Sequence, residues 1–428
     1  MTDITGSFYN FLNVVYIYPF AMSLLWIALA LRFYVSYVHS DKYDREPRQL
    51  ESPPFVSVLI PCHNEEEAIT ETIERLTGGL DYPHYEIICV DDGSTDKTWE
   101  ILQGLRQNEP HLRIVKVEHN AGKAHALTQG AIAARGEFLL GIDADSFLEH
   151  DAINNLVANM LGMKHTEMYF LGRKRSGIGA VTGNPIVRNR STLLAKIQLV
   201  EYASIIGLIK RAQRLYGRIG TVSGVCVLYR KRALFDIGWW DQDMITEDIS
   251  ATWKLQLGNW ECHYDPESLC WMLVPETVKG LYLQRLRWAQ GGIEVLFRYI
   301  RVFIEPRKWA QLPLLVEQFI SLTWSFLWYI AMGVFFYQWL VQGNFNWVAF
   351  SLGGLLVLIC MVQLTISVMF ARRYDPITLR YLFWAGWYPF IYWMINPFTV
   401  IVALPKAIKR TVKGGQATWK SPDRGKTA

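Results

Sequence analysis

Two aspartates separated by one residue, Asp143 and Asp145, follow the largely apolar residues 137–142. Such a stretch is typical of a buried strand, whose end lies at the sheet edge where ligands bind. In an extended chain residues i and i+2 point the same way, so the two carboxylates can share one divalent cation. Mg²⁺ or Mn²⁺ held by only two carboxylates keeps positions for phosphate oxygens. A DxD pair alone is more often a solvated turn, so neighbouring motifs must decide.

Other polar residues follow further apolar stretches. Glu65 comes after the first, Asp92 lies in the turn VDDGS after the second, and Lys123 opens a helix in the segment NAGK. A lysine beside free backbone N–H groups at a helix start suits a diphosphate. Taken singly, each has a simpler explanation, because aspartate often caps helices and a loop lysine is usually solvated.

A third acidic motif, Thr246-Glu247-Asp248, opens a predicted helix with Thr246 as its expected N-cap. A carboxylate near a helix N-terminus is stabilised in its charged form, so Asp248 could accept a proton. The alternative is that both carboxylates only complement the helix dipole.

The segment QRLRW contributes Gln284, Arg287 and Trp288. Between Leu281 and Phe303 apolar residues recur at helical spacing with arginines off that face. This pattern predicts an amphipathic helix on the inner membrane surface, assigned to residues 276–308.

Strands that alternate with helices position these residues. The expected strands cover residues 55–61, 85–90, 112–117, 137–143 and 222–230, and the expected helices cover 65–77, 95–107, 122–134 and 191–215. Alternation with continuous apolar strands predicts an α/β domain over residues 55–275 with a mostly parallel sheet covered on both faces. Ligands bind beyond the carboxyl ends of such strands, which is where the acidic motifs fall.

The apolar residues are concentrated at the two ends of the chain. Of the 428 residues 51% are hydrophobic, and 17 are tryptophans. Residues 8–31 could span a bilayer, and basic residues follow but do not precede them. We therefore expect an uncleaved anchor over residues 1–40, with the N-terminus outside, then a linker over 41–54 and a cytoplasmic domain. The net charge of +4 and the absence of basic runs argue against nucleic acid.

Three more apolar segments, 312–341, 346–370 and 381–404, make up a C-terminal membrane region over 309–404. Basic residues at 372, 373 and 380 mark an inside loop. If the last segment spans, the basic tail over 405–428 lies outside, against the positive-inside rule. We favour a helix that Pro389, Asn396 and Pro397 break or make re-entrant, although spanning stays open.

Together, these motifs resemble the processive family 2 glycosyltransferases, the class of cellulose, chitin and hyaluronan synthases, in order and spacing. Longer stretches over 181–211, 244–257, 270–292 and 417–425 are similar to bacterial poly-β-1,6-N-acetylglucosamine synthases, which make biofilm exopolysaccharide. The resemblance covers residues 61–425. It implies a GT-A-like nucleotide-sugar transferase domain flanked by transmembrane and interfacial helices in a multi-pass inner-membrane protein.

The resemblance also implies roles for the residues. Glu65, Asp92, Lys123 and Asp143 would bind the donor, UDP-N-acetylglucosamine, with Asp143 and Asp145 holding Mg²⁺ or Mn²⁺. Asp91 differs from many relatives, where a non-acidic residue often stands, and we expect it to be structural.

On the acceptor side, the resemblance makes Asp248 the general base that deprotonates the acceptor's 6-hydroxyl in an inverting transfer. Gln284, Arg287 and Trp288 would bind the growing polysaccharide, with Trp288 stacking on its last sugar. Trp419 and residues 421–424 of the tail could cover the donor site, or the tail could be disordered.

Two alternatives stay open. A hyaluronan-, chitin- or cellulose-type synthase would share this core but use another sugar or linkage. A membrane transporter with a degenerate nucleotide-binding domain is a second, against which all the expected acidic residues are present. The chain has fewer membrane segments than larger synthases, so the resemblance also implies a small membrane accessory subunit beside the lipid bilayer.

Overall fold

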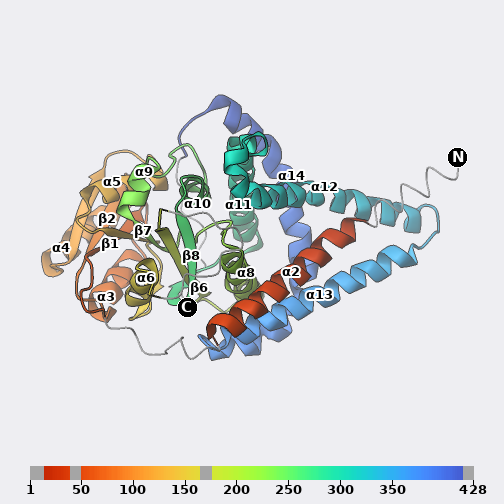
Figure 1. Cartoon of the computed structure of the whole chain (residues 1–428), viewed down its shortest axis with the longest axis horizontal. Helices are drawn as coiled ribbons and strands as arrows, with labels where there is room; N and C mark the ends of the chain where they lie inside the picture. The colour runs from red at the N-terminus through yellow and green to blue at the C-terminus, as the bar shows by residue number, and fades with distance from the viewer. Residues whose placement is uncertain (1–13, 39–49, 164–175, 418–428) are drawn as a thin grey trace.

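The protein has an α/β part at one end and a group of long apolar helices at the other (Figure 1). The computed structural model describes residues 14–38, 50–163 and 176–417. Three predicted features fall partly or wholly outside the described residues: the first part of the N-terminal anchor, most of the 41–54 linker, and the tail segment with Trp419 and residues 421–424.

The α/β part is built on one eight-stranded sheet in the order β3-β2-β1-β4-β7-β6-β8-β5. Its first half is parallel, as predicted, and consists of β1 (Val56–Cys62), β2 (Tyr85–Asp92), β3 (Leu112–Val117) and β4 (Phe138–Ile142). Every residue of β1, β2 and β4 is buried, since helices cover both faces. Continuous apolar sequence was therefore the correct signal for these strands.

Three helices connect the parallel strands: α3 (Ile69–Gly79), α4 (Thr98–Asn108) and α5 (Lys123–Ala133). α3 begins four residues later than the predicted 65–77. The reason is that Asn64 is left-handed, with φ of 58°, and the Glu65 N–H donates to Thr98 Oγ1 at 2.7 Å. This loop is therefore tied to the start of α4 before α3 can begin.

The second half of the sheet is mixed. β7 (Cys226–Arg230) is antiparallel to β4, and the remaining strands are β6 (Ile178–Val187), β8 (Glu261–Met272) and β5 (Phe147–Leu148). The helices here are α6 (Ala152–Met160), α9 (Lys231–Asp236) and α10 (Glu247–Leu257). β7 is shorter than the predicted 222–230, because the N–H groups of Val222 and Ser223 donate to threonine side chains instead of a neighbouring strand.

The predicted helix over 191–215 is three connected pieces. α7 (Leu193–Tyr202) passes into a π-helical turn (Ala203–Leu208) and then α8 (Ile209–Tyr216). π-turns inside helices often occur at functional sites. Gln363 of the apolar region donates to Ser204 Oγ at 2.9 Å, so this turn joins the α/β part to the long helices.

The helix that carries QRLRW, α11 (Val278–Tyr299), continues as a 3-10 turn (Ile300–Ile304), close to the predicted 281–303. Thr277 caps it by accepting from the Gly280 N–H at 3.0 Å. A buried ion pair ties α11 to α7, with Arg285 nitrogens 3.0 and 2.6 Å from the Glu201 carboxylate. In Figure 1, α11 lies between α10, which the Thr246-Glu247-Asp248 motif opens, and the long apolar helices.

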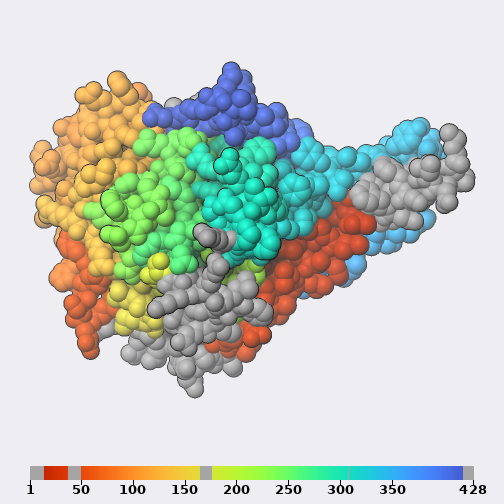
Figure 2. Space-filling model, turned by 45° about the horizontal axis from the view of Figure 1, so that its top comes forward, coloured from red at the N-terminus to blue at the C-terminus, as the bar shows by residue number. Residues whose placement is uncertain are grey.

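Among the residues that the structure describes, four helical stretches are long and apolar enough to cross a membrane, which fits a membrane protein. They contain α2 (Ile17–Phe33), α12 (Leu312–Leu340), α13 (Trp347–Ala371), and a 3-10 segment (Pro376–Trp387) followed by α14 (Tyr388–Lys413). Figure 2 shows the tip of α12 and α13 projecting from the wider α/β part. Their large apolar side chains stay exposed, as lipid-facing surface does.

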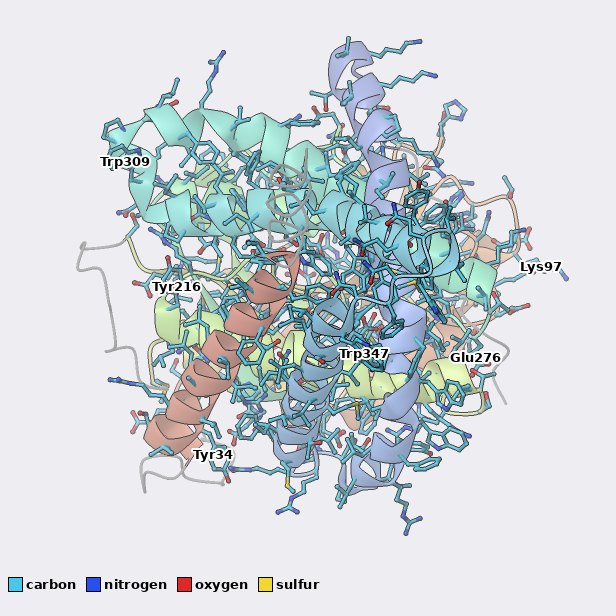
Figure 3. All side chains as sticks on the ribbon, turned by 90° about the vertical axis from the view of Figure 1, so that its right-hand side faces the viewer. Tyr34, Lys97, Tyr216, Glu276, Trp309 and Trp347 are labelled. Carbon is cyan, nitrogen blue, oxygen red and sulfur yellow. The ribbon has the colours of Figure 1, made fainter. Side chains whose placement is uncertain are left out.

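The last apolar segment departs from the expected break. α14 contains Pro397 and Pro405 without interruption, and the change in geometry lies earlier, where the 3-10 segment ends at Trp387. In Figure 3 α14 lies to one side of α2 and α13, and it packs along α11 through Ala403 and Ala407. Small side chains at this contact allow the two helices to approach closely.

We expect Arg285→Met to destabilise the fold strongly, because Glu201 would stay buried without its counter-charge. The free energy of unfolding should fall by about 3–5 kcal/mol. Arg232→Met is the matched control, since it breaks an exposed pair with Asp236 at 2.8 Å and should cost less than about 1 kcal/mol. Thermal unfolding of the purified variants in detergent measures both, and equal losses would contradict the burial argument.

Candidate active site

A cavity of about 370 Å³ lies where the carboxyl end of β4 faces α10 and α11. All of the predicted site residues except Glu65 and Asp92 line it: Lys123, Asp143, Asp145, Asp248, Gln284, Arg287 and Trp288. These residues come from four separate motifs. The tertiary structure therefore brings the predicted metal, base and acceptor residues to one place.

Asp143 and Asp145 stand at the end of β4, as predicted. Asp145 is buried, and burial together with the charge of Asp143 raises its pKa to about 7. Ser146 Oγ donates to Asp145 Oδ1 at 3.2 Å. Two carboxylates this close repel each other, and a divalent cation relieves that repulsion, so this donor set suits Mg²⁺ or Mn²⁺. Within the described part of the chain no larger His, Cys, Asp and Glu cluster could hold a metal.

Lys123, the first residue of α5, joins two of the acidic motifs. Its Nζ lies 2.6 Å from Asp143 Oδ1 and 3.2 Å from Glu247 Oε1. These two carboxylates raise the pKa of the lysine despite its burial, so it is charged at any physiological pH. Glu247 was not predicted as a site residue. Its position beside Asp248 was the available signal, but the sequence could not show which of the two faces Lys123.

Asp92 organises the loop that precedes Lys123. Its carboxylate accepts from the N–H groups of Ala121 at 3.1 Å and Gly122 at 2.8 Å. Gly122 has φ of 93°, a conformation that L side chains rarely adopt. Asp92 and Glu65 are both buried outside the cavity lining, and their predicted part in donor binding stays a prediction.

Asp248 is held in one orientation by two backbone donors. Oδ1 accepts from the Ile249 N–H at 2.9 Å, and Oδ2 accepts from the Gly224 N–H at 3.2 Å. Burial and the charge of Glu247 raise its pKa to about 6, while Lys123 acts in the opposite direction. The carboxylate is therefore ionised at neutral pH yet close to the pKa at which it exchanges a proton, which suits a general base.

Thr246 occupies the N-cap position of α10, but the predicted capping bond by its side chain is absent. The hydroxyl instead packs on α11, where a Cβ built at Gly291 would lie 2.0 Å from Thr246 Oγ1. Contact between the two helices has replaced the local cap. Gly291 therefore allows α11 to approach the start of the acidic helix.

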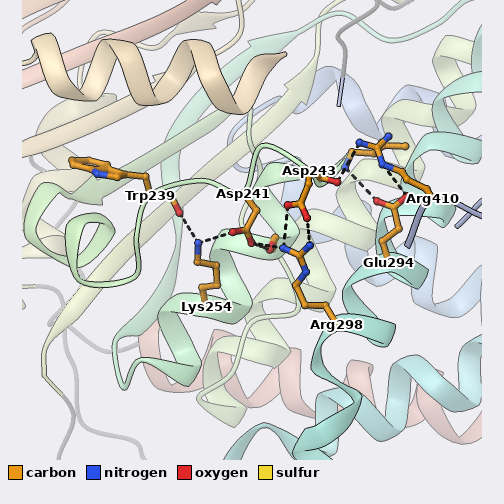
Figure 4. Close-up of polar contacts among 9 residues, drawn as sticks. Trp239, Asp241, Asp243, Lys254, Glu294, Arg298 and Arg410 are labelled. Atoms are coloured by element: carbon orange, nitrogen blue, oxygen red, sulfur yellow. Dashed lines mark hydrogen bonds and ion pairs between the residues drawn. The ribbon is translucent and has the colours of Figure 1, made fainter. Parts of the chain in front are cut away.

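Charged side chains of α10 and α11 bind the loop at residues 241–243, which precedes Thr246 (Figure 4). Asp241 Oδ1 accepts from Lys254 Nζ at 2.8 Å, and its Oδ2 lies 3.3 Å from Arg298. Arg298 also pairs with the Asp243 carboxylate, and these hydrogen bonds lower the pKa of Asp243. The two aspartates therefore hold the loop against α11 through these ion pairs.

The end of α14 contacts the same loop at residues 241–243. Arg410 Nη2 donates to the Asp243 carbonyl at 3.2 Å, and Arg410 Nε lies 3.7 Å from Glu294 of α11. The Ala417 N–H donates to the Gln242 carbonyl at 2.9 Å. The end of the last apolar helix thus contacts the loop that leads into Thr246-Glu247-Asp248.

On the opposite wall, Trp288 lies beneath the guanidinium of Arg285, which is 4.5 Å from its ring centroid. Gln284 Oε1 is buried without a hydrogen-bond partner. Of the residues that the structure describes, no carboxylate pairs with Arg287. A fixed aromatic face beside an amide and a guanidinium suits a polar sugar ring. The pair of Arg285 with Glu201 that holds this wall was not predicted.

The sequence comparisons decide the family. Residues 57–238 match the model of glycosyl transferase family 2. Poly-β-1,6-N-acetyl-D-glucosamine synthase from Staphylococcus epidermidis (strain ATCC 35984) is 41% identical over 427 residues, covering 96% of this chain and 98% of the relative. The synthase of the same name from Staphylococcus aureus (strain COL) is 40% identical, covering 98% and 99%. The chain belongs to the poly-β-1,6-N-acetyl-D-glucosamine synthase family.

A solved structure supports the fold independently. The mannosyltransferase PcManGT from Pyrobaculum calidifontis, in complex with GDP-Man and Mn²⁺, superposes with a TM-score of 0.59 at 20% identity, covering 93% of this chain and 99% of that chain. The predicted GT-A-like α/β class, with a glycosyltransferase domain beside apolar helices, is confirmed.

Gly291→Ala should destabilise this family member, because the added methyl group would collide with Thr246. The cost of overpacking a close helix contact is about 1–3 kcal/mol. Gly104→Ala in α4 is the control, since nothing lies within 4 Å of its built Cβ and alanine favours a helix. If the midpoints of thermal unfolding of both variants match that of the parent, the contact at Gly291 is looser than described.

Proposed function

We propose that this chain is a processive, inverting N-acetylglucosaminyltransferase that polymerises UDP-N-acetylglucosamine into a β-1,6-linked exopolysaccharide and helps export it for biofilm formation. The observation that carries the proposal is the shared cavity, in which Asp248 faces the paired aspartates and Trp288. The names of the relatives supply the sugar and the linkage. A hyaluronan-, chitin- or cellulose-type activity would need relatives of another kind.

The reaction needs one base and a stabilised leaving group. Asp248 takes the proton of the acceptor's 6-hydroxyl as that oxygen bonds to C1 of the donor sugar, while the bond from C1 to the diphosphate oxygen breaks. A single displacement inverts C1, so one ionised carboxylate is sufficient. Lys123, which lines the same cavity, supports the departing charge of UDP.

The leaving group carries a diphosphate, and Asp143 and Asp145 would hold the divalent cation that neutralises it. The mannosyltransferase with a similar fold contains Mn²⁺, and Mg²⁺ suits the same oxygen donors. Burial and the charge of Asp143 raise the pKa of Asp145, and a cation held between the two carboxylates would favour its ionised form.

Glu65 and Asp92 would bind the nucleoside part of the donor. That part would lie beside the loop before Lys123, outside the cavity. Gln284, Arg287 and Trp288 would hold the acceptor end of the growing polysaccharide. A stacked aromatic ring retains a sugar without fixing its register, which suits a chain that must advance after each transfer. The position of Trp288 on α11, beside the long helices, supports synthesis joined to export.

We assign the α/β domain to the cytoplasm of a multi-pass inner-membrane protein. α2 serves as the N-terminal anchor, while α12 and α13 span, and α11 and α14 lie along the membrane face. The contacts of Arg410 and Ala417 with the loop at 242–243 support a C-terminal tail on the catalytic side. A small accessory subunit would complete the conduit, and full polymer export by the purified chain alone would contradict this.

Asp248→Asn should abolish polymer formation, since the amide cannot accept the proton, while UDP binding measured by calorimetry stays within about twofold. Asp81→Asn, at an exposed site, is the control and should keep parental activity. The assay supplies labelled UDP-sugars to membranes and identifies the linkage of the product. Retained polymerisation by Asp248→Asn, or a product with another sugar or linkage, would contradict the proposal.

Cysteine labelling tests the topology. Lys409→Cys at the exposed end of α14 should react with a membrane-impermeant maleimide only after the cells are opened, because it lies on the cytoplasmic side. Asn344→Cys, in the exposed turn between α12 and α13, should react in intact cells. Labelling of both positions from outside would show that the last segment crosses the membrane.

A further inference from the structure

Lys210 of α8 is a second buried lysine of the cavity, and the proposed reaction does not use it. Its Nζ donates to Ser223 Oγ at 2.5 Å. In the described ranges, no carboxylate forms an ion pair with it, whereas Lys123 has two such partners. An ammonium group is costly to bury on a single neutral hydroxyl, so its presence here calls for a function.

The hydrogen bond of Lys210 leads directly to the base. Ser223 is fixed a second time, because its N–H donates to Thr182 Oγ1 at 2.8 Å. The next residue, Gly224, donates its N–H to Asp248 Oδ2. A Cβ at Gly224 would lie only 3.2 Å from that oxygen, so the loop packs closely on the carboxylate. Lys210 therefore anchors the loop that orients Asp248.

The charge of Lys210 acts on the same carboxylate. Burial lowers the pKa of the lysine to about 7, and the negative charge of Asp248 opposes that shift. The interaction is mutual, so an ammonium at this position must also favour the ionised form of Asp248. Several titratable and charged groups surround the two residues: Glu247, Lys123, Cys226, Tyr202, Tyr229, Arg287, Asp143 and Asp145.

We propose that Lys210 is a positioning residue for Asp248, fixing the 223–224 loop that donates to the carboxylate and keeping it charged when it must accept a proton. The proposal rests on the proposed role of Asp248 as base. Lys210 touches no reacting atom in this role. Contact with the acceptor sugar is the competing role, and it predicts a different kinetic result.

The test compares Lys210→Met and Lys210→Arg with the parent over pH 5 to 8.5 in membranes saturated with the metal. A base must be ionised, so activity falls as the pH drops through the pKa of Asp248. Removing the cation raises that pKa, and the acidic limb of kcat/KM for Lys210→Met should move up by about one pH unit, a loss of about fivefold at pH 6 that approaches tenfold at pH 5. Lys210→Arg keeps the positive charge, so its acidic limb should stay close to that of the parent.

Lys231→Met is the control, because Lys231 donates to the Ala134 carbonyl at 2.7 Å, away from the cavity, and should leave the profile unchanged. An unmoved acidic limb for Lys210→Met, with a uniform loss or a raised KM for an added oligosaccharide acceptor, would overturn the positioning role. If Lys210→Met fails to fold, Lys210→Gln takes its place, and an unshifted pH profile of kcat/KM for that variant would equally overturn the positioning role. A failure of the proposed function is a separate result, because it would appear as polymer formation retained by Asp248→Asn.

Discussion

The ion pairs of Lys123 are the constraint on which the site depends. One ammonium group lies between Asp143, at the end of the parallel half of the sheet, and Glu247, at the start of α10. Without it, the carboxylates of Asp143 and Glu247 would lie in one cavity with no counter-charge between them, which electrostatic repulsion disfavours. Asp92 in turn fixes the loop that delivers Lys123. The acidic motifs therefore form one assembly rather than separate binding residues.

A second constraint joins that assembly to the membrane helices. Two contacts hold the loop before Asp248 against α11. One is the close packing of Thr246 on Gly291, and the other is the ion pairs of Asp241 and Asp243 with Arg298. The same helix carries Trp288, and its pairing through Arg285 reaches α7. A displacement of α11 must therefore move Trp288 and the loop before Asp248 together. This geometry gives a physical route by which the polymer path could affect transfer.

The buried charged and polar side chains differ in whether an opposite charge balances them. Glu201 and Arg285 neutralise each other, whereas Lys210 has a hydroxyl and Gln284 Oε1 has no partner. Unsatisfied polar groups are rare in protein interiors and concentrate at functional sites. They lie along the wall of the cavity where the acceptor would enter. The site is therefore built to be completed by a polar ligand.

The sequence by itself determined the parallel strands, the apolar helices and the residues of the DAD, TED and QRLRW motifs, because period, length and residue type are local properties. It misjudged the start of α3 and the break at Pro397, through which α14 continues. Thr246 is the N-cap residue of α10 as predicted, but its side chain packs on Gly291 instead of capping the helix. Only the tertiary structure decided that Glu247 pairs with Lys123, that Asp92 holds a loop, and that Lys210 binds Ser223 beside Asp248. Those facts depend on which buried charges meet, and no spacing along the chain records that.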